Sequence, residues 1–295
     1  MDSVGVLTQS EPTQATTRDA VRARRLLAWV VLAELVLLYA PTVRWLYERW
    51  TLSVWHNAHG LLIPFVVAYF VRQELRPLSH APRESSAWGF ALLVPALVLH
   101  VLDQSMQTQL LSAISIVVAL PGLSLLFLGP TRTRAILFPL VLTAFALPIP
   151  LAMTEPVHML LRQITTAACA AILPVIGVPV FVEGTTLHLA STPVQVSDAC
   201  SGFSTLYASV ALAYLTAYTT PGWGRKLLIL AAAAPLAIAA NILRVLGLVL
   251  AVAWTGPEVL DTFWHPLSGM LTFAMALPVI FWLGQPSKTP QRIAA

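Results

Sequence analysis

Residues 226–254 read KLLILAAAAPLAIAANILRVLGLVLAVAW, and after the first lysine the only charged side chain in this run is Arg244. A helix that crosses a bilayer needs about 20 mostly apolar residues, so the run is long enough to span a membrane. A charged side chain in the middle of such a helix is rare and costly, and it usually serves a function. The run therefore predicts a membrane protein and points to one residue of its site.

The composition of the whole chain agrees with this interpretation. Hydrophobic residues make up 57% of the 295 positions and charged residues only 10%, whereas roughly a quarter of the residues in a soluble domain are charged. The net charge of +4 does not indicate nucleic acid, because the basic residues lie in short connectors and form no patch. We expect an all-α, polytopic membrane helix bundle in contact with lipid, and no nucleic-acid partner.

Apolar runs recur along the chain, and each predicts one membrane-spanning helix. The eight predicted spans are 26–43, 59–72, 88–102, 110–128, 135–152, 203–219, 226–254 and 266–284. The first of them follows arginines but lacks a small-residue cleavage site, so we interpret it as an uncleaved span. Residues 1–25 and 286–295 are then expected to be tails, with one membrane domain, 26–285, between them.

One segment between the fifth and sixth spans has a different character. Residues 157–180 contain Arg162 and several polar residues, and they predict an amphipathic helix on or re-entering the outer surface. Residues 181–189 and 193–196 show short alternations rich in Val and Thr, which favour a small β-hairpin.

The distribution of Lys and Arg predicts the orientation, because basic residues near span ends concentrate on the cytoplasmic side. With the N-terminus inside, most of the 17 basic residues fall on that side. They are Arg18, Arg22, Arg24, Arg25, Arg72, Arg76, Arg83, Arg132, Arg134, Arg225, Lys226, Lys288 and Arg292. The sequence therefore predicts a protein of the bacterial inner membrane with both termini in the cytoplasm.

In this topology three polar residues fall on the outer side. Cys200 lies where a polar loop turns into the sixth span, and a helix N-terminus there favours the thiolate and offers N–H groups to an oxyanion. Arg244 lies inside the seventh span, and His265 opens the eighth. Together they supply a nucleophile, a base and a fixed positive charge, which are the parts that acyl transfer needs. The sequence leaves open whether the sixth and eighth spans are neighbours.

Five further residues are expected to support this site. Asn241 shares a helix face with Arg244, one turn away, and Ser201 and Gly202 follow Cys200 directly. Asp198 either orients His265 or caps the sixth helix, and we favour the cap. His59 either contacts substrate or is structural. Its neighbour His56 has no ligand partners at metal-binding spacing, so we expect neither a metal nor another cofactor.

Two other residues, Cys169 and Glu34, are weaker candidates for the site. Cys169 lies among alanines and is expected to be a packing residue. Glu34 in the first span is expected to pair with Arg244 or to face a polar cavity.

A transporter with Arg244, Asn241 and Glu34 along its substrate path is the main alternative function, although the inverted repeats typical of transporters are not evident. A polyprenyl-linked sugar or acyl transferase would need acidic or His clusters, and none is evident.

Several short motifs in the sequence resemble motifs of the exosortase/archaeosortase family. They are Asp-Ala-Cys-Ser-Gly-Phe at 198–203, Asn-x-x-Arg at 241–244, His265 before a Gly-containing last span, His-Gly-Leu-Leu-Ile-Pro at 59–64 and Leu-Pro-Ile-Pro at 147–150. The resemblance covers roughly residues 26–285. Each motif is weak by itself, but their order within an eight-span chain is specific.

This resemblance implies a membrane-embedded cysteine protease or transpeptidase that acts on exported proteins. Its substrates would carry a C-terminal sorting signal made of a short motif such as Pro-Glu-Pro, a transmembrane helix and a basic tail. Cys200 would be the nucleophile, Arg244 the essential arginine and His265 the third member of the site. The resemblance implies a thioester that an acceptor amine or water resolves, and the acceptor, a lipid or an exopolysaccharide among the alternatives, is not identified.

Overall fold

The computed structural model describes residues 14–51, 59–80, 84–190 and 192–285 and is mostly helical. The chain divides into two compact units. The first contains residues 1–45 and 83–130, and the second contains residues 46–82 and 131–295. All eight residues of the predicted site belong to the second unit.

The first unit is built from the long helix α1 (Gln14–Thr51) up to Trp45, from α3 (Gly89–Met106) and from the first part of α4 (Leu110–Leu142). Helices α3 and α4 approach closely, since a Cβ atom at Gly89 would lie 2.4 Å from the carbonyl oxygen of Gly122. Small residues allow such close helix packing inside a membrane. A buried hydrogen bond of 2.8 Å between Tyr39 and Ser115 connects α1 with α4.

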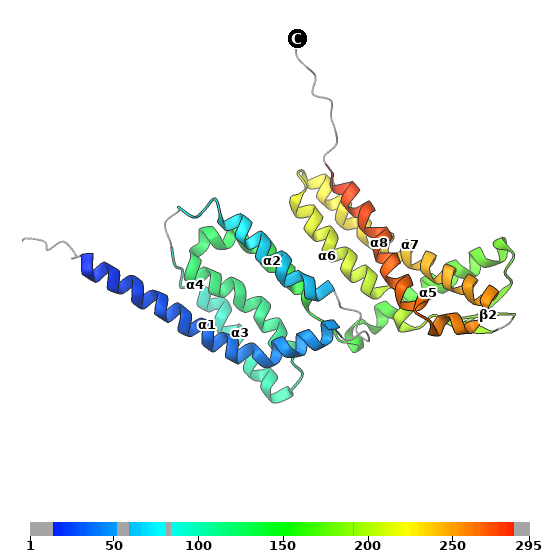
Figure 1. Cartoon of the computed structure of the whole chain (residues 1–295), viewed down its shortest axis with the longest axis horizontal. Helices are drawn as coiled ribbons and strands as arrows, with labels where there is room; N and C mark the ends of the chain where they lie inside the picture. Colours follow the sequence, from blue (N-terminus) through cyan, green and yellow to red (C-terminus); the bar gives the residue numbers. More distant parts are fainter. Residues whose placement is uncertain (1–13, 52–58, 81–83, 191, 286–295) are drawn as a thin grey trace, which may run out of the picture. The chain divides into compact units, whose positions relative to one another are not determined.

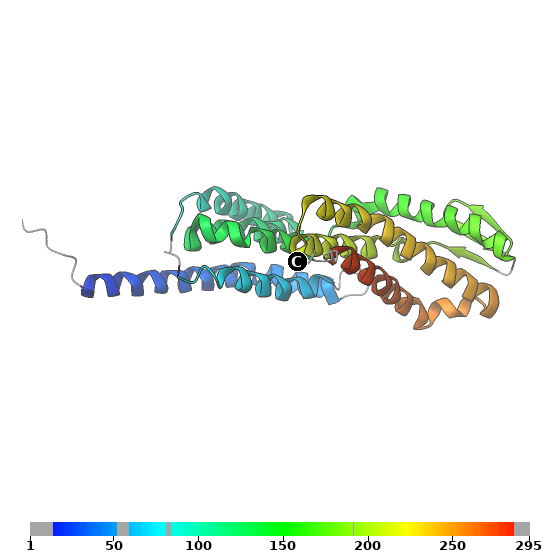
Figure 2. The ribbon, with the colours of Figure 1, turned by 90° about the horizontal axis from the view of Figure 1, so that it is seen from above.

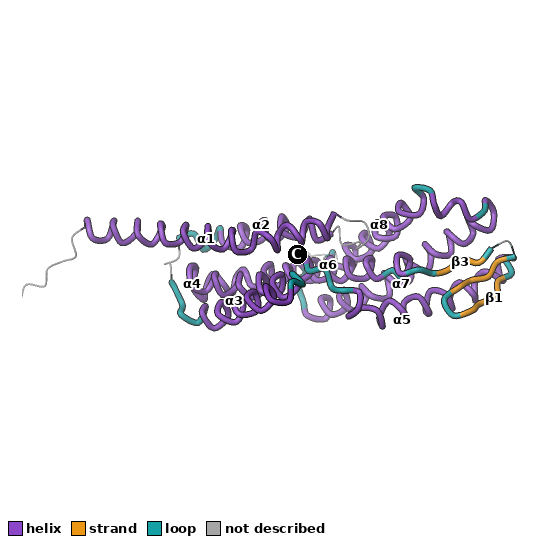
Figure 3. Tube along the Cα trace, turned by 90° about the horizontal axis from the view of Figure 1, so that it is seen from below, coloured by secondary structure: helices purple, strands orange, loops and turns teal. Residues whose placement is uncertain are grey.

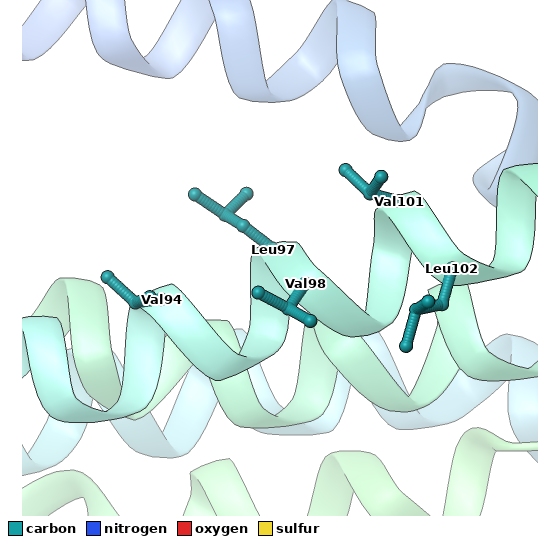
Figure 4. Close-up of a pocket in the computed structure, with 5 residues that line it drawn as sticks. All are labelled: Val94, Leu97, Val98, Val101 and Leu102. Carbon is teal, nitrogen blue, oxygen red and sulfur yellow. The ribbon is translucent and has the colours of Figure 1, made fainter.

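A shallow apolar groove runs along α3 in this unit. Figure 4 shows the side chains that line it, which are Val94, Leu97, Val98, Val101 and Leu102. An all-apolar lining suits contact with hydrocarbon chains. None of the predicted site residues lines the groove, so we do not interpret it as a substrate site.

Helix α4 is interrupted at Gly129, whose φ of 81° and ψ of 174° are not helical. A Cβ atom there would lie 2.7 Å from the Cβ of Glu84, so both the space and the positive φ require glycine. The interruption falls between the predicted spans 110–128 and 135–152. Beyond Gly129 the helix continues to Leu142 and then into a 3-10 turn, η2 (Thr143–Ala146).

The second unit has a core of three packed helices, α6 (Phe203–Thr219), α7 (Trp223–Thr255) and α8 (Trp264–Gly284). Figures 1 and 2 show these helices side by side. Small residues make the contact close, because Ala213 and Ala233 are fully buried against Ile229 and Ile280. Helices α6 and α8, which correspond to the predicted sixth and eighth spans and whose relation the sequence left open, are therefore neighbours.

Two further helices complete this unit. Helix α5 (Leu151–Ile172) packs against α7. Helix α2 (His59–Leu75) packs against η2, and the Trp50 indole N–H next to it donates a 2.8 Å hydrogen bond to the Ala146 carbonyl. Trp50 also fills the space beside Gly60, where a Cβ atom would lie 2.4 Å from the indole nitrogen.

The predicted β-hairpin is present and has a third strand. Strands β1 (Val180–Glu183), β2 (Thr186–Leu189) and β3 (Pro193–Gln195) form an antiparallel sheet in the order β1-β2-β3 (Figure 3). The inward side chains Leu187 and Val194 pack with Val249 and Val252 of α7. The sheet is thereby fixed to the helices just before the chain reaches Cys200.

The prediction of a polytopic helical bundle is confirmed. Within the described residues, six helices are long and apolar enough to cross a membrane. This set does not include α2 and α6, which have 17 residues each. It also counts the kinked α4 as one span, where the sequence predicted two. The number of eight spans therefore stays a prediction. The set includes α5, and our placement of the 157–180 segment at the outer surface likewise stays a prediction. The C-terminal tail, part of the N-terminal tail and His56 lie outside the described residues.

Candidate active site

Cys200 lies in a tight turn between the sheet and α6. After β3 the chain stays extended through Ser197 and then forms the 3-10 turn η4 (Asp198–Cys200). The Cys200 N–H donates to the Ser197 carbonyl at 2.9 Å, and the Ser201 N–H donates to the Asp198 carbonyl at 3.2 Å. These two bonds close the turn, and Cys200 is only 7% exposed.

Gly202 lets this turn run directly into α6. Its φ is 83°, in the left-handed region, where residues with a Cβ atom are strained. A Cβ atom would also lie 2.5 Å from the Asn241 side-chain carbon Cγ. Backbone conformation and close packing therefore both require glycine after the Cys-Ser pair.

His265 faces the thiol from the start of α8. The Cys200 Sγ and the His265 Nε2 are 3.7 Å apart, within hydrogen-bonding range for sulfur, although 65 residues separate them in the chain. The other ring nitrogen, Nδ1, is buried and has no hydrogen-bond partner among the described residues. The geometry allows Nε2 to accept the thiol proton.

Arg244 carries the positive charge next to this pair. Its Nε donates a 3.0 Å hydrogen bond to the Ser268 hydroxyl, which in turn donates to the His265 carbonyl at 2.6 Å. The guanidinium is close enough to interact electrostatically with both Cys200 and the His265 ring. A Cβ atom at Gly269 would lie 3.5 Å from the Arg244 Cζ, so the glycine leaves room for the guanidinium.

The surroundings favour the neutral form of His265. Burial lowers the pKa of its imidazole below the ordinary value, the Arg244 charge lowers this pKa further, and Asp261 opposes both effects. A neutral imidazole can accept a proton, whereas an imidazolium cannot. The ring is therefore suited to act as a base at neutral pH.

Asn241 fastens the turn to α7. Its Nδ2 donates to the Cys200 carbonyl at 3.0 Å and to the Thr165 hydroxyl at 3.2 Å. The residue is 1% exposed, so neither bond is exchanged readily for water. Asn241 thus acts on the main chain that carries the thiol and does not contact the thiol itself.

Helix α5 supplies three contacts that the sequence interpretation missed. The His158 Nδ1 is 2.9 Å from the Ser201 hydroxyl, Arg162 forms a 2.7 Å ion pair with Asp198, and Thr165 accepts from Asn241. These three residues are spaced by four and three positions and so share one face of a helix. The signal was present as a polar stripe, which we interpreted only as the polar side of an interfacial helix.

The predicted role of Asp198 as a helix cap is wrong. The N-cap residues of η4 and α6 are Ser197 and Gly202, and neither makes a side-chain cap bond. The Asp198 carboxylate is instead bound by Arg162, which also holds Glu155 at 2.7 Å. The Ser201 hydroxyl approaches the Phe203 N–H at 3.3 Å and so takes part of the capping role.

Three of the backbone N–H groups near the thiol are already used, and an oxyanion hole formed by the others stays a prediction. The N–H groups of Cys200, Ser201 and Phe203 already donate to acceptors within the turn. They cannot receive an oxyanion without breaking those bonds. Arg244 is the group of the predicted site that has the charge for this task.

The remaining predicted residues lie further from the thiol. The His59 ring packs edge-on against Tyr207 at 5.3 Å, and Tyr207 stacks on Phe203. Phe203 in turn stacks on His158, so His59 reaches the turn only through aromatic contacts. Cys169 is fully buried in the core, and Glu34 is exposed on α1.

Within the described parts of the chain, no three His, Cys, Asp or Glu side chains are grouped closely enough to hold a metal ion. The fold and this cluster define a polytopic membrane protein with a cysteine in the turn before α6, an arginine on α7 and a histidine on α8. The family model of the transmembrane exosortases matches residues 50–282, and the chain belongs to that family. No curated protein matches the chain. No solved structure matches it either.

Membership in this family defines the general role. Transmembrane exosortases are membrane cysteine proteases or transpeptidases that act in protein sorting. Their substrates are exported proteins with sorting signals. The matched range includes Cys200, Arg244 and His265 together with all five predicted supporting residues.

Proposed function

We propose that this protein cleaves the C-terminal sorting signals of exported proteins through a thioester on Cys200. Its substrates carry a short motif of the Pro-Glu-Pro kind, a transmembrane helix and a basic tail. The observation that carries this proposal is the 3.7 Å approach of the His265 Nε2 to the Cys200 Sγ, with Arg244 acting on both groups.

The first half-reaction uses all three residues. His265 Nε2 takes the thiol proton, and the thiolate attacks the carbonyl carbon of the scissile peptide bond. The C–N bond then breaks, His265 returns the proton to the leaving amine, and the acyl group remains on Cys200 as a thioester. Arg244 stabilises the thiolate and the oxyanion of the tetrahedral intermediate, since a fixed charge in a water-poor site is effective there.

The second half-reaction reverses this proton transfer. An acceptor amine or water attacks the thioester while His265 takes a proton from it, and the Cys200 thiol is released with the proton. An amine acceptor gives transpeptidation onto a lipid or polysaccharide carrier, and water gives simple proteolysis. No cofactor is needed for either outcome.

We place the site on the outer side of the bacterial inner membrane, with residues 1–25 and 286–295 as cytoplasmic tails of one membrane domain. The basic connectors support this orientation. Because Cys200 is buried, cysteines at exposed positions are better probes. In a Cys200→Ala background, a membrane-impermeant thiol reagent should label Phe181→Cys from outside and should miss Trp223→Cys; the reverse pattern would contradict the orientation.

The activity is tested by co-expressing the protein with a substrate that ends in a Pro-Glu-Pro-type signal. Wild-type protein should shorten the substrate, and Cys200→Ala, Cys200→Ser and Arg244→Ala should each leave it at full length. Thr219→Ala, on α6 but outside the site, serves as the matched control and should process normally. Processing by Cys200→Ala would exclude the thioester mechanism. The geometry does not favour the transporter alternative, because Arg244 is hydrogen-bonded to Ser268 beside the Cys200–His265 pair.

A further inference from the structure

Strand β3 is an edge strand that leads into the nucleophile. It pairs with β2 on one side, and among the described residues the order β1-β2-β3 places no strand on its other side. Gln195 ends β3, and Cys200 follows five residues later through the extended Ser197. The unpaired edge is therefore continuous with the turn that carries the thiol.

The register shows which main-chain groups this edge offers. The Val196 N–H donates to the Thr185 carbonyl, and the Leu189 N–H donates to the Thr192 carbonyl, so both pairs are hydrogen-bonded pairs of the ladder. Such pairs alternate with non-bonded ones along antiparallel strands. The pair of Gln195 with Thr186 lies next to the bonded pair of Val196 with Thr185, so it is non-bonded. The N–H and C=O of Gln195 therefore point away from β2.

Burial along the strand agrees with an open edge. Val194 and Val196 are buried against the core, whereas Pro193, Gln195 and Ser197 are exposed. Pro193 lacks an N–H, and it occupies the same outward-pointing register as Gln195, as expected for proline on an edge strand. Within the described residues, the Gln195 main chain has no hydrogen-bond partner on this side.

The geometry points to this edge as the docking site for the substrate, resting on the function proposed above. The occupant is the extended segment of an exported protein that precedes its transmembrane helix, and it adds to β3 as a fourth strand. Main-chain hydrogen bonds to an edge strand bind a peptide in extended form with little demand on its side chains. Gln195 and Cys200 are at most about 17 Å apart along an extended chain, a distance that roughly five residues of an added strand cover.

Disulfide trapping in the full-length protein tests the pairing directly. The background is Cys200→Ala, which keeps the substrate intact, and Cys169 is fully buried and out of reach. Gln195→Cys is combined with a scan of single cysteines through the substrate segment. Because side chains of a strand alternate between faces, we expect disulfides at every second substrate position and few at the positions between. Phe181→Cys on the opposite edge strand is the control and should form none.

A second experiment separates the Gln195 main chain from its side chain. Gln195→Ala removes the side chain and keeps the N–H, whereas Gln195→Pro removes the N–H as well. The proline variant should therefore process the substrate roughly tenfold more slowly than the alanine variant at low substrate concentration.

The outcomes distinguish this inference from the proposed function. If wild-type protein processes the substrate but the disulfides follow no alternation, or Phe181→Cys traps it equally well, the docking site is wrong and the function stands. Normal processing by Gln195→Pro would likewise contradict the docking site and leave the proposed function intact. If wild-type protein leaves the substrate intact, both proposals fail.

Discussion

The side-chain amide of Asn241 donates a hydrogen bond to the main-chain carbonyl of Cys200 at 3.0 Å. The bond connects the middle of α7 to the turn that precedes α6, and the same amide reaches Thr165 of α5. One amide thus connects α7 and α5 to the short piece of backbone that carries the thiol. The position of the thiol relative to His265 depends on this arrangement. Substitution of Asn241 can therefore test the position of the thiol without any change to Cys200.

We predict that Asn241→Leu slows substrate processing by roughly tenfold to a hundredfold. The substitution leaves the buried Cys200 carbonyl without its donor, which costs about 1–3 kcal/mol. Thr165→Val is the matched control, because it removes the other partner of the amide and keeps the bond to Cys200. Initial rates in membranes measure both effects. Equal losses in the two variants would show that the bond to Cys200 has no special importance.

Gly202→Ala should abolish processing and lower the thermal stability. The new Cβ atom would lie 2.5 Å from Asn241 and would also strain a backbone with φ of 83°. Gly177 separates the two causes, because its φ is 87° and nothing lies within 4 Å of a Cβ atom there. Gly177→Ala therefore carries the strain of about 1–2 kcal/mol alone. If it is as inactive as Gly202→Ala, steric contact with Asn241 is not the cause.

The acid limit of the activity should lie below the ordinary imidazole value of about 6.5. His265 must be neutral to accept the thiol proton, and burial and Arg244 lower its pKa. Asp261 raises this pKa, so Asp261→Asn should lower it further and move the acid limit to lower pH. The pH profile of kcat/KM measures the shift, and salt should weaken it because Asp261 is exposed. A shift to higher pH would contradict the assignment of His265 as the base.

The ion pair of Arg162 with Asp198 should be coupled to the rate of processing. Arg162 is 11% exposed and Asp198 is 45% exposed, so the pair is only partly screened by water. We predict that Arg162→Met and Asp198→Asn each slow processing a few-fold and that the double variant is no slower than Arg162→Met. The double-mutant cycle measures this coupling. Glu155→Gln breaks the other contact of Arg162 and should leave the rate nearly unchanged; additive losses would contradict a shared role.

The sequence was sufficient for the features that depend on hydropathy and on local pattern. Apolar runs predicted the helices, and the alternation after residue 180 predicted the hairpin. The charge bias placed Cys200 and His265 on one side of the membrane, and the structure brings them to 3.7 Å. The kink at Gly129 lies where the sequence predicted a break between two spans.

Other features depend on tertiary contacts and could not be derived in this way. The partner of Asp198 is Arg162, 36 residues earlier, and local sequence favoured a helix cap instead. His158 was unremarkable until the structure placed it 2.9 Å from the Ser201 hydroxyl. Hydropathy alone also leaves the number of spans open, because α2 and α6 are short and α5 is both apolar and striped with polar residues.

If Cys200 and His265 act together as proposed, their separation along the chain determines when the protein can act during its synthesis. Cys200, the proposed nucleophile, emerges from the ribosome just before α6, but His265 emerges 65 residues later, at the start of the last helix. Until α8 is inserted, the thiol has neither the imidazole nor the Ser268 hydroxyl that holds Arg244. On the proposed mechanism, a nascent chain cannot attack neighbouring exported proteins, and only a fully inserted molecule becomes competent.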